Sequence, residues 1–322
     1  MKQRTVMSKV VIAFDLGGTN LRLAAVTAEG EIIFRTKRDT PKSTKSDEIL
    51  QIIIECAGEC IDFLKNRIEI KMIAAAVPAA VNAKDGIVLK APNIPCLDGF
   101  RFVEALSDIL KIRVILENDA NAAALGENWL GAAKDFESSI CVTLGTGVGG
   151  GIIIDGKILR GVDGTAGEIG HICVEPFGAL CGCGSNGCVE QYASAKALVR
   201  LAGELGREFP KSYLRGKFDI SAQEIYEAGK QGDKLALEVF RQQGFYLGIA
   251  LANLINVLNP EVIVIGGGAA AGWDLFVPSL QAEINKRAYR EPAERVKIFR
   301  AECGDDAGIL GVARLAFRQG LE

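Results

Sequence analysis

The chain has 322 residues, of which 49% are hydrophobic and 24% charged, and its formal net charge is −3. This is the composition of an ordinary globular protein that is large enough for two domains. A nearly neutral chain offers no electrostatic case for binding nucleic acid or an anionic membrane, so small molecules are the expected partners.

No targeting or membrane-spanning segment is predicted. The apolar stretch Val10–Phe14 is interrupted by Asp15, which makes it too short for a signal peptide. The apolar run Tyr246–Ile265 contains three asparagines and a proline, which favours a buried helix followed by a strand over a bilayer span. The nine cysteines are odd in number and partly clustered, so a reducing cytoplasm is expected rather than a disulfide framework.

The first part of the chain predicts an antiparallel meander followed by alternating helices and strands. Short glycine-containing turns, Gly17-Gly18 and Glu29-Gly30, separate the strands of the meander, which are expected at residues 9–14, 21–27 and 31–36. Apolar periodicity then predicts a helix at 46–65, a strand at 72–77, a helix at 102–110, a strand at 113–116 and an alanine-rich helix at 120–130.

The pattern then restarts, with strands expected at 139–144, 149–154 and 157–159. Further helices are predicted at 194–205, 221–228, 234–258 and 307–317, and further strands at 262–265 and 296–300. The restart suggests two related α/β halves that face each other across a cleft. We expect a small domain at 1–118 plus 303–322 and a large domain at 119–302.

Three glycine-rich turns each follow an apolar strand: Asp15-Leu-Gly-Gly-Thr, Leu144-Gly-Thr-Gly and Ile265-Gly-Gly-Gly. One such turn is usually an ordinary hairpin, but ligands collect at the carboxyl ends of strands in open α/β sheets. Backbone amides and threonine hydroxyls in the first two turns would hold phosphates, and the third would let an adenosine approach the backbone. Neither the Walker nor the Rossmann pattern is present.

Two aspartates have both a structural and a chemical interpretation. Asp15 is either a turn residue or a group that holds Mg²⁺ through water beside the phosphate loops. The pair Asn118-Asp119 precedes a predicted helix, so these residues make an ordinary N-terminal cap. In the catalytic interpretation, Asp119 accepts the proton of a substrate hydroxyl that attacks the γ-phosphoryl group.

The single histidine, His171, precedes three closely spaced cysteines, Cys181, Cys183 and Cys188. One imidazole and three thiols at this spacing predict a closed, structural tetrahedral zinc site, with Cys173 as a substitute ligand. The remaining cysteines are expected to be small buried hydrophobic residues: Cys56, Cys60, Cys96, Cys141 and Cys303. Glu168 and Glu190 flank the cluster and are suited to accept hydrogen bonds from the vicinal hydroxyls of a pyranose.

Taken together, these motifs resemble the ROK family (repressors, open reading frames and sugar kinases), and within it the bacterial glucokinases. The resemblance runs from about residue 10 to 311 and rests on Asp15-Leu-Gly-Gly-Thr-Asn-Leu-Arg22, Glu117-Asn-Asp-Ala-Asn-Ala-Ala-Ala-Leu-Gly-Glu127, Leu144-Gly-Thr-Gly-Val-Gly-Gly-Gly151, Gly167-Glu-Ile-Gly-His171 and Cys181-Gly-Cys-Gly-Ser-Asn-Gly-Cys-Val-Glu190.

The resemblance implies a two-domain, actin-like and hexokinase-like ATPase fold with ribonuclease H-like halves, a cleft between the domains, and a cytoplasmic homodimer. It implies ATP, Mg²⁺ and a structural Zn²⁺ held by His171, Cys181, Cys183 and Cys188. Asp119 would be the catalytic base. Sugar hydroxyls would be held by Asn93, Asn118, Asp119, Glu168, His171 and Glu190. The nucleotide and its metal would be held by Asp15, Gly17, Gly18, Thr19, Asn20, Gly145, Thr146, Gly147, Gly266, Gly267 and Gly268.

Two departures from the family pattern concern the sugar side. The family usually shows Gly-x-Pro-Gly-Pro-Val where this chain has Ala76-Val-Pro-Ala-Ala-Val81, and the tryptophan common shortly after Asn93 is missing, with Leu97 nearby. The expected reaction is phosphorylation of a hexose at the 6-hydroxyl, with glucose first.

The alternatives are the same reaction on N-acetylmannosamine, N-acetylglucosamine, mannose or fructose, and a sugar-responsive transcriptional regulator that lacks its DNA-binding domain. A zinc-ribbon nucleic-acid binder is disfavoured by the near-neutral charge. Pocket shape decides among the hexoses, and motifs do not show it.

Overall fold

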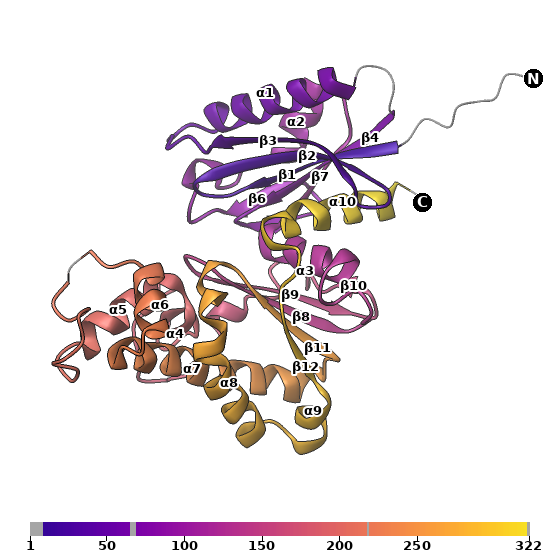
Figure 1. The fold of residues 1–322 in the computed structure, drawn as a ribbon. Coiled ribbons are helices and arrows are strands. Elements are labelled where there is room, and N and C mark those ends of the chain that lie inside the picture. The colour runs from indigo at the N-terminus through magenta and orange to yellow at the C-terminus, as the bar shows by residue number, and fades with distance from the viewer. Residues whose placement is uncertain (1–8, 65–68, 218, 321–322) are drawn as a thin grey trace, which may run out of the picture. The chain divides into compact units, whose positions relative to one another are not determined.

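The computed structural model describes residues 9–64, 69–217 and 219–320. They form two compact units (Figure 1). Unit 1 comprises the chain up to Lys134, the segment Ile158–Ala166 and the chain from Asp305 on, and unit 2 comprises Asp135–Lys157 and Gly167–Gly304. The division expected from the sequence differs mainly in the placement of residues 119–134 and 158–166, which belong to unit 1.

A five-stranded sheet in the order β3-β2-β1-β4-β7 forms the centre of unit 1. Its strands are β1 (Lys9–Leu16), β2 (Asn20–Thr27), β3 (Ile32–Asp39), β4 (Glu69–Val77) and β7 (Val114–Asn118). β1, β2 and β3 pair antiparallel, which confirms the predicted meander, and β4 pairs parallel with both β1 and β7. Residues 10–14 of β1 are fully buried, as expected for a central strand that is covered on both faces.

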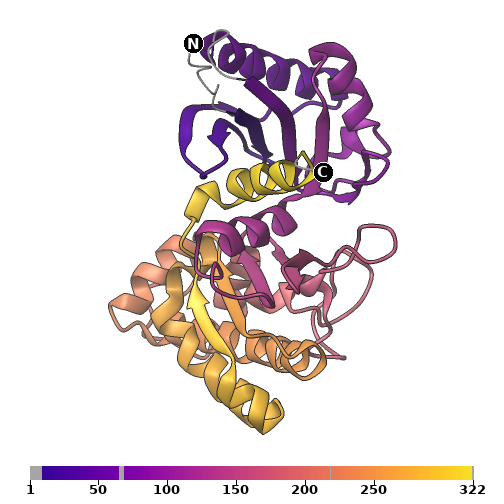
Figure 2. The same cartoon turned by 90° about the vertical axis from the view of Figure 1, so that its right-hand side faces the viewer.

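Helices cover both faces of this sheet (Figure 1). On one side lie α1 (Ser46–Leu64) and α2 (Phe102–Leu110), and on the other α3 (Asp119–Leu130) and α10 (Ala307–Gln319). Position 65, the last residue of the predicted first helix, lies outside the described residues. The hairpin of β5 (Ala80–Asn82) and β6 (Ile87–Lys90) was not predicted, because strands this short carry little periodicity. Figure 2 shows α10, at the yellow end of the chain, lying against the sheet of unit 1.

The sheet of unit 2 also has five strands, in the order β10-β9-β8-β11-β12, which corresponds to the order β3-β2-β1-β4-β7 in unit 1. Its strands are β8 (Ser139–Leu144), β9 (Val148–Ile154), β10 (Lys157–Ile158), β11 (Val262–Gly266) and β12 (Lys297–Arg300). β8 and β9 pair antiparallel, and β11 is parallel to both β8 and β12. The predicted relation between the two α/β halves is therefore confirmed at the level of sheet topology.

The helices of unit 2 are α4 (Glu190–Ala193), α5 (Ala195–Leu205), α6 (Ala222–Lys230), α7 (Lys234–Leu258), α8 (Trp273–Arg287) and α9 (Arg290–Arg295). The predicted bounds of α7 are confirmed, and Asp233 caps its first turn by accepting from the amides of Leu235 and Ala236. Helices α4, α8 and α9 were not predicted. In α8, an internal Pro278 obscures the helical pattern.

Short 3₁₀ turns complete the structure: η1 (Pro95–Leu97), η2 (Ile169–His171), η3 (Gly268–Gly272) and η4 (Gly304–Asp306). Among the described residues, no helix combines the length and apolar character that crossing a lipid bilayer requires.

Candidate functional site

In unit 1, the predicted polar residues gather at the carboxyl edge of the parallel strands. Asp15 of β1 is in register with Ala76 of β4, and Ala76 is in register with Glu117 of β7. The next residues along β7 are Asn118 and then Asp119, where α3 begins. Ligands collect at this edge in open α/β sheets, so the fold places both candidate aspartates where the sequence analysis expects a site.

Asp15 is a largely buried carboxylate with one nearby cation. Its side chain is 19% exposed, and its Oδ2 lies 3.7 Å from Nη1 of Arg22. Nη2 of Arg22 lies 2.8 Å from Oδ2 of Asp305. Burial raises the pKa of Asp15 to about 6, Arg22 opposes the rise, and Asp305 adds to it. The carboxylate thus carries an electrostatic cost that a bound cation would relieve.

The turn after Asp15 is held by backbone bonds and contacts Asn93. The amide of Gly17 donates to the carbonyl of Asn20 (2.8 Å), and the amide of Thr40 donates to that of Thr19 (2.8 Å). A Cβ on Gly18 would lie 3.4 Å from Cβ of Asn93. Unit 1 therefore brings the predicted phosphate turn and the predicted sugar-binding asparagine together, and both Gly18 and Asn93 are exposed.

Asn118 is the N-cap of α3, as the structural interpretation of the sequence expected. Its Oδ1 accepts from the amides of Ala120 (2.9 Å) and Asn121 (3.0 Å), and its Nδ2 donates to the carbonyl of Ala79 (3.1 Å). These bonds use the acceptor and one donor N–H of the Asn118 amide, and the second N–H has no partner among the described residues. Asp119 is half-buried, and its Oδ1 accepts from the amide of Ala120 (2.9 Å).

In unit 2, two of the predicted glycine loops lie side by side. Gly266 at the end of β11 pairs with Thr143 of the parallel strand β8, so both strands end at the same edge. Gly267 has φ of 88°, and a Cβ there would collide with the backbone carbonyl of Leu144. Only glycine permits this approach, so the Gly266–Gly268 turn packs against the start of the Leu144–Gly147 turn.

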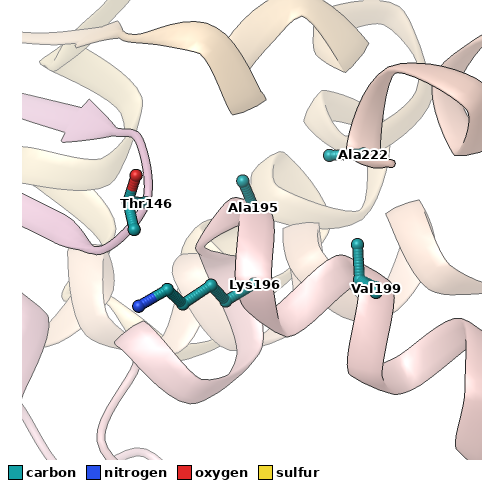
Figure 3. A pocket seen from close by; sticks show the side chains of 5 residues that line it. All are labelled: Thr146, Ala195, Lys196, Val199 and Ala222. Carbon is teal, nitrogen blue, oxygen red and sulfur yellow. The ribbon is translucent and has the colours of Figure 1, made fainter. Parts of the chain in front are cut away.

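The N-terminus of α5 contacts the Leu144–Gly147 turn. The amide of Ala195 donates to the carbonyl of Gly145 (2.9 Å), and Oγ of Ser194 caps the helix by accepting from the amide of Ala197 (3.2 Å). A cavity of about 330 Å³ is lined by Thr146, Ala195, Lys196, Val199 and Ala222 (Figure 3). The ammonium group of Lys196 points toward the part of the cavity that Thr146 lines (Figure 3). A helix N-terminus and an ammonium group together favour an anion.

Glu190, one of the predicted sugar-binding residues, lies beside the Gly145–Gly147 loop. It is half-buried at the start of α4, and its Oε2 accepts from the amide of Val148 (3.0 Å). The carboxylate lies so close to Gly147 that any side chain there would collide with it. Glu190 therefore lies directly beside the Gly145–Gly147 loop, and its Oε1 has no hydrogen-bond partner in the described part of the chain.

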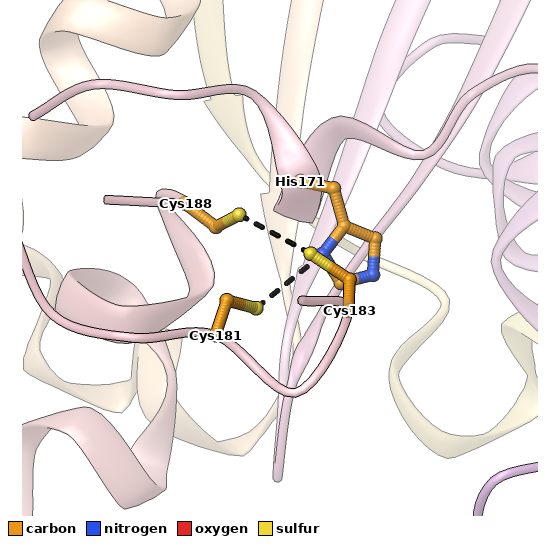
Figure 4. A group of neighbouring side chains, drawn as sticks. All are labelled: His171, Cys181, Cys183 and Cys188. Atoms are coloured by element: carbon orange, nitrogen blue, oxygen red, sulfur yellow. Dashed lines mark hydrogen bonds between the residues drawn. The ribbon is translucent and has the colours of Figure 1, made fainter. Parts of the chain in front are cut away.

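The histidine and three cysteines converge as predicted (Figure 4). Their ligand atoms all lie within 4.8 Å of one another. Sγ of Cys183 is 3.6 Å from Sγ of Cys188, and Sγ of Cys181 is 3.7 Å from Nδ1 of His171. Two thiolates on a tetrahedral zinc, each at about 2.3 Å, would be roughly 3.8 Å apart. The donor set and its spacing therefore fit zinc.

The other cysteines and Glu168 differ in how far they are buried. Cys173 is exposed and forms a β-bridge with Cys188 through the backbone, and the group of four does not include it. Glu168 is exposed and precedes η2, which carries His171. Of the cysteines expected to be buried, Cys56, Cys60 and Cys141 are, and burial raises the pKa of Cys60 to about 12. Cys96 and Cys303 are only half-buried, which corrects that expectation.

Two features of these sites were not predicted from the sequence. Lys196 lies two residues after the Ser194 cap, in the first turn of α5. The available signal was a serine that follows the metal motif and precedes a helical pattern. The ion pair of Glu117 and Arg160 had no such signal, because its members are 43 positions apart.

A comparison with protein families finds that the model of the ROK family matches residues 11–319. The chain belongs to the ROK family. The glucokinase of Halalkalibacterium halodurans is 37% identical over 314 residues, which cover 96% of this chain and 95% of that protein. The two-sheet α/β fold expected from the resemblance is confirmed.

Solved ROK structures include both enzymes and regulators. A ROK glucokinase from Streptomyces griseus, solved with glucose and AMPPNP, has a TM-score of 0.81 at 34% identity, covering 96% of this chain and 99% of that one. A ROK transcriptional regulator described as a homologue of the E. coli MLC protein has a TM-score of 0.88 at 30% identity, covering 98% and 80%. Likeness of fold alone does not separate the two classes.

Proposed function

We propose that this ROK protein is an ATP-dependent hexose kinase that phosphorylates the 6-hydroxyl of glucose. The observation that carries the proposal is an arrangement in unit 2. The glycine loop Gly145–Gly147, the N-terminus of α5 with Lys196, and the carboxylate of Glu190 lie next to one another. Groups suited to a triphosphate and a group suited to a sugar hydroxyl are what phosphoryl transfer to a sugar needs. Its glucokinase relatives support the same conclusion.

The donor would be held by backbone amides and by fixed charge. In the proposal, the amides of Thr146 and Gly147 bind phosphate oxygens, and the ammonium of Lys196 offsets their charge. Gly145 shapes the loop, because its own amide donates to the carbonyl of Gly147 (2.9 Å). Gly266–Gly268 leaves room for the adenosine. Asp15 would hold Mg²⁺ through water, which suits a carboxylate that keeps part of the ion's hydration shell. The bound ion would neutralise charge on the transferring phosphoryl group.

The acceptor would be held by hydrogen bonds from polar side chains. We assign Asp119 as the group that takes the proton of the 6-hydroxyl. The remaining N–H of Asn118 donates to a sugar oxygen. The other proposed sugar contacts are Asn93, Glu168, His171 and Glu190. A positioned hydroxyl gains most of its reactivity from orientation, because the protein supplies no covalent chemistry in this transfer.

His171, Cys181, Cys183 and Cys188 would hold a structural zinc. The ion would fix the loop that carries His171, and the ring nitrogen that does not bind the metal would be free to hydrogen-bond the sugar. Cys181 and Cys188 are buried, while His171 and Cys183 are exposed, so the cluster has one face inside the unit and one at its surface. A closed set of four ligands leaves no position for substrate on the metal.

The experiment is sugar-dependent ADP release from MgATP by the purified protein, with kcat/KM compared for glucose, mannose, fructose, N-acetylglucosamine and N-acetylmannosamine. A preference for glucose would support the proposal. A preference for another hexose would retain the kinase and change its substrate, with the Ala76–Val81 segment as the first place to look. Sugar binding without turnover would favour the second candidate, a sugar-responsive regulator, which the likeness to a ROK regulator supports.

A further inference from the structure

Unit 1 buries one carboxylate directly before the candidate base. Glu117 is 1% exposed, and both of its oxygens are used. Oε1 accepts from the amide of Asn118 (3.1 Å) and from Nδ2 of Asn121 (3.0 Å). Oε2 accepts from Nε of Arg160 (2.8 Å) and forms an ion pair with its Nη2 (2.7 Å). A charge this deep is tolerated only when it is paired and hydrogen-bonded, and here both conditions are met.

The cation comes from a separate part of the chain. Arg160 lies in the segment Ile158–Ala166, which belongs to unit 1 although the chain on both sides of it belongs to unit 2. The segment closes on itself, because the amide of Ala166 donates to the carbonyl of Arg160 (3.1 Å). Gly164 lies against the backbone of Val81, where no Cβ would fit. Arg160 is therefore held in place by a fixed loop.

The carboxylate acts on the turn from β7 to α3. Glu117 binds the amide of Asn118, and Asn118 in turn caps α3 and bonds the carbonyl of Ala79. Through Asn121, Glu117 also holds the first turn of the helix on which Asp119 lies. Loss of the charge would weaken the bonds to both ends of this turn, and an amide nitrogen in place of Oε2 would leave Arg160 without its acceptor.

We propose that the ion pair between the buried Glu117 and the partly exposed Arg160 is a positioning device that sets the direction of Asn118 and Asp119 for phosphoryl transfer. Neither residue touches the substrate in this proposal. It rests on the proposed function, because it assigns the pair to the same base. Displacing a reacting group by about 1 Å costs on the order of 100-fold in rate, so an effect on kcat is expected without a matching effect on donor binding.

The test is steady-state kinetics on Glu117→Gln, Arg160→Gln, Arg160→Lys and the double variant Glu117→Gln/Arg160→Gln. Both single glutamine variants should lower kcat on the order of 100-fold and leave KM for ATP within about twofold. Arg160→Lys should retain part of the activity, because it keeps the charge but loses the two-pronged geometry. The double variant should recover activity relative to Glu117→Gln, since two amides can bond each other.

The matched control is Arg35→Gln, which breaks a two-pronged ion pair with Asp306 elsewhere in unit 1 (2.6 and 2.7 Å) and should leave kcat unchanged. If the pair served stability alone, Glu117→Gln and Arg160→Gln would lower the yield or melting temperature and keep kcat per folded molecule, and that result would overturn the proposal. If Glu117→Gln does not fold, Arg160→Lys still tests the proposal, because it keeps the positive charge beside Glu117.

Amide hydrogen exchange over residues 117–122 separates this proposal from the kinase assignment. If these amides exchange faster in Arg160→Gln than in wild type, and at the wild-type rate in Arg35→Gln, the positioning role is supported even if the wild-type protein phosphorylates no sugar. Unchanged exchange in Arg160→Gln would overturn the positioning role even if the wild-type protein is an active kinase.

Discussion

Replacing Asp15 by asparagine should make unit 1 more stable while it removes a proposed functional group. Burial raises the pKa of Asp15 from 3.8 to about 6, against the opposing effect of Arg22. A carboxyl group whose pKa is higher in the folded than in the unfolded state binds its proton more tightly when folded. Stability therefore falls as the pH rises from about 4 to about 6. A pKa difference of about two units corresponds to about 3 kcal/mol at neutral pH.

The stabilisation should depend on pH in a definite way. From these two pKa values, the removal of the charge is worth about 1.5 kcal/mol at pH 5 and about 3 kcal/mol at pH 8. Any effect of the asparagine side chain itself is independent of pH, so the difference between the two pH values isolates the carboxylate. The matched control is Asp62→Asn, the same chemical change at an exposed position of α1 in the same unit, for which we expect less than about 0.5 kcal/mol.

The two tryptophans allow unit 1 to be followed alone. Trp129 lies in α3 of unit 1, where its ring is 6.3 Å from that of Phe317, and Trp273 lies in α8 of unit 2. In a Trp273→Phe background, fluorescence during urea unfolding reports unit 1, and wild type and Asp15→Asn are compared at pH 5 and pH 8 without ATP or Mg²⁺. A stability difference that stays constant between the two pH values, or a less stable variant at pH 8, would refute the reasoning.

Three further results are expected. Asp119→Asn should leave sugar binding, measured by calorimetry, largely intact and lower kcat by orders of magnitude; near-normal turnover would exclude Asp119 as the base. Cys183→Ser should lose zinc, measured by metal analysis, and weaken sugar affinity through His171, whereas Cys173→Ser should keep both; a zinc-free variant with unchanged affinity would make the metal remote from the sugar. Lys196→Met should raise KM for ATP about tenfold and leave KM for the sugar unchanged, and the opposite pattern would place the lysine on the acceptor.

Much of the fold could be predicted because its elements have strong local patterns. The meander of β1, β2 and β3 and the long helix α7 follow from apolar periodicity, and the Asn118 cap follows from residue type and position. Elements with weak local signals were missed. The β5–β6 hairpin has strands of only three and four residues, and α8 has a proline inside it. Periodicity needs length and regularity, and these segments lack one or the other.

For the candidate sites, the sequence predicted which residues take part better than it predicted their hydrogen-bond partners. The ligand set of His171 and three cysteines shows in the sequence because its spacing is short. The bond from the amide of Val148 to Glu190 spans 42 positions, and it depends on where α4 lies relative to β9. No local pattern encodes such a choice, because a glutamate suited to a sugar hydroxyl is equally suited to a backbone amide.

The place of α10 in unit 1 has a consequence for how the protein is made. The helix is formed by the last described residues of the chain, yet it packs against β1 and β4, which are synthesised first, and it buries residues along most of its length. Until α10 is synthesised, one face of that sheet lacks this helix. Unit 2 is encoded almost entirely before this point and can fold while the chain is still on the ribosome. Unit 1 therefore completes its fold after unit 2, and a chain that stops before α10 would leave an apolar surface open to chaperones and proteases.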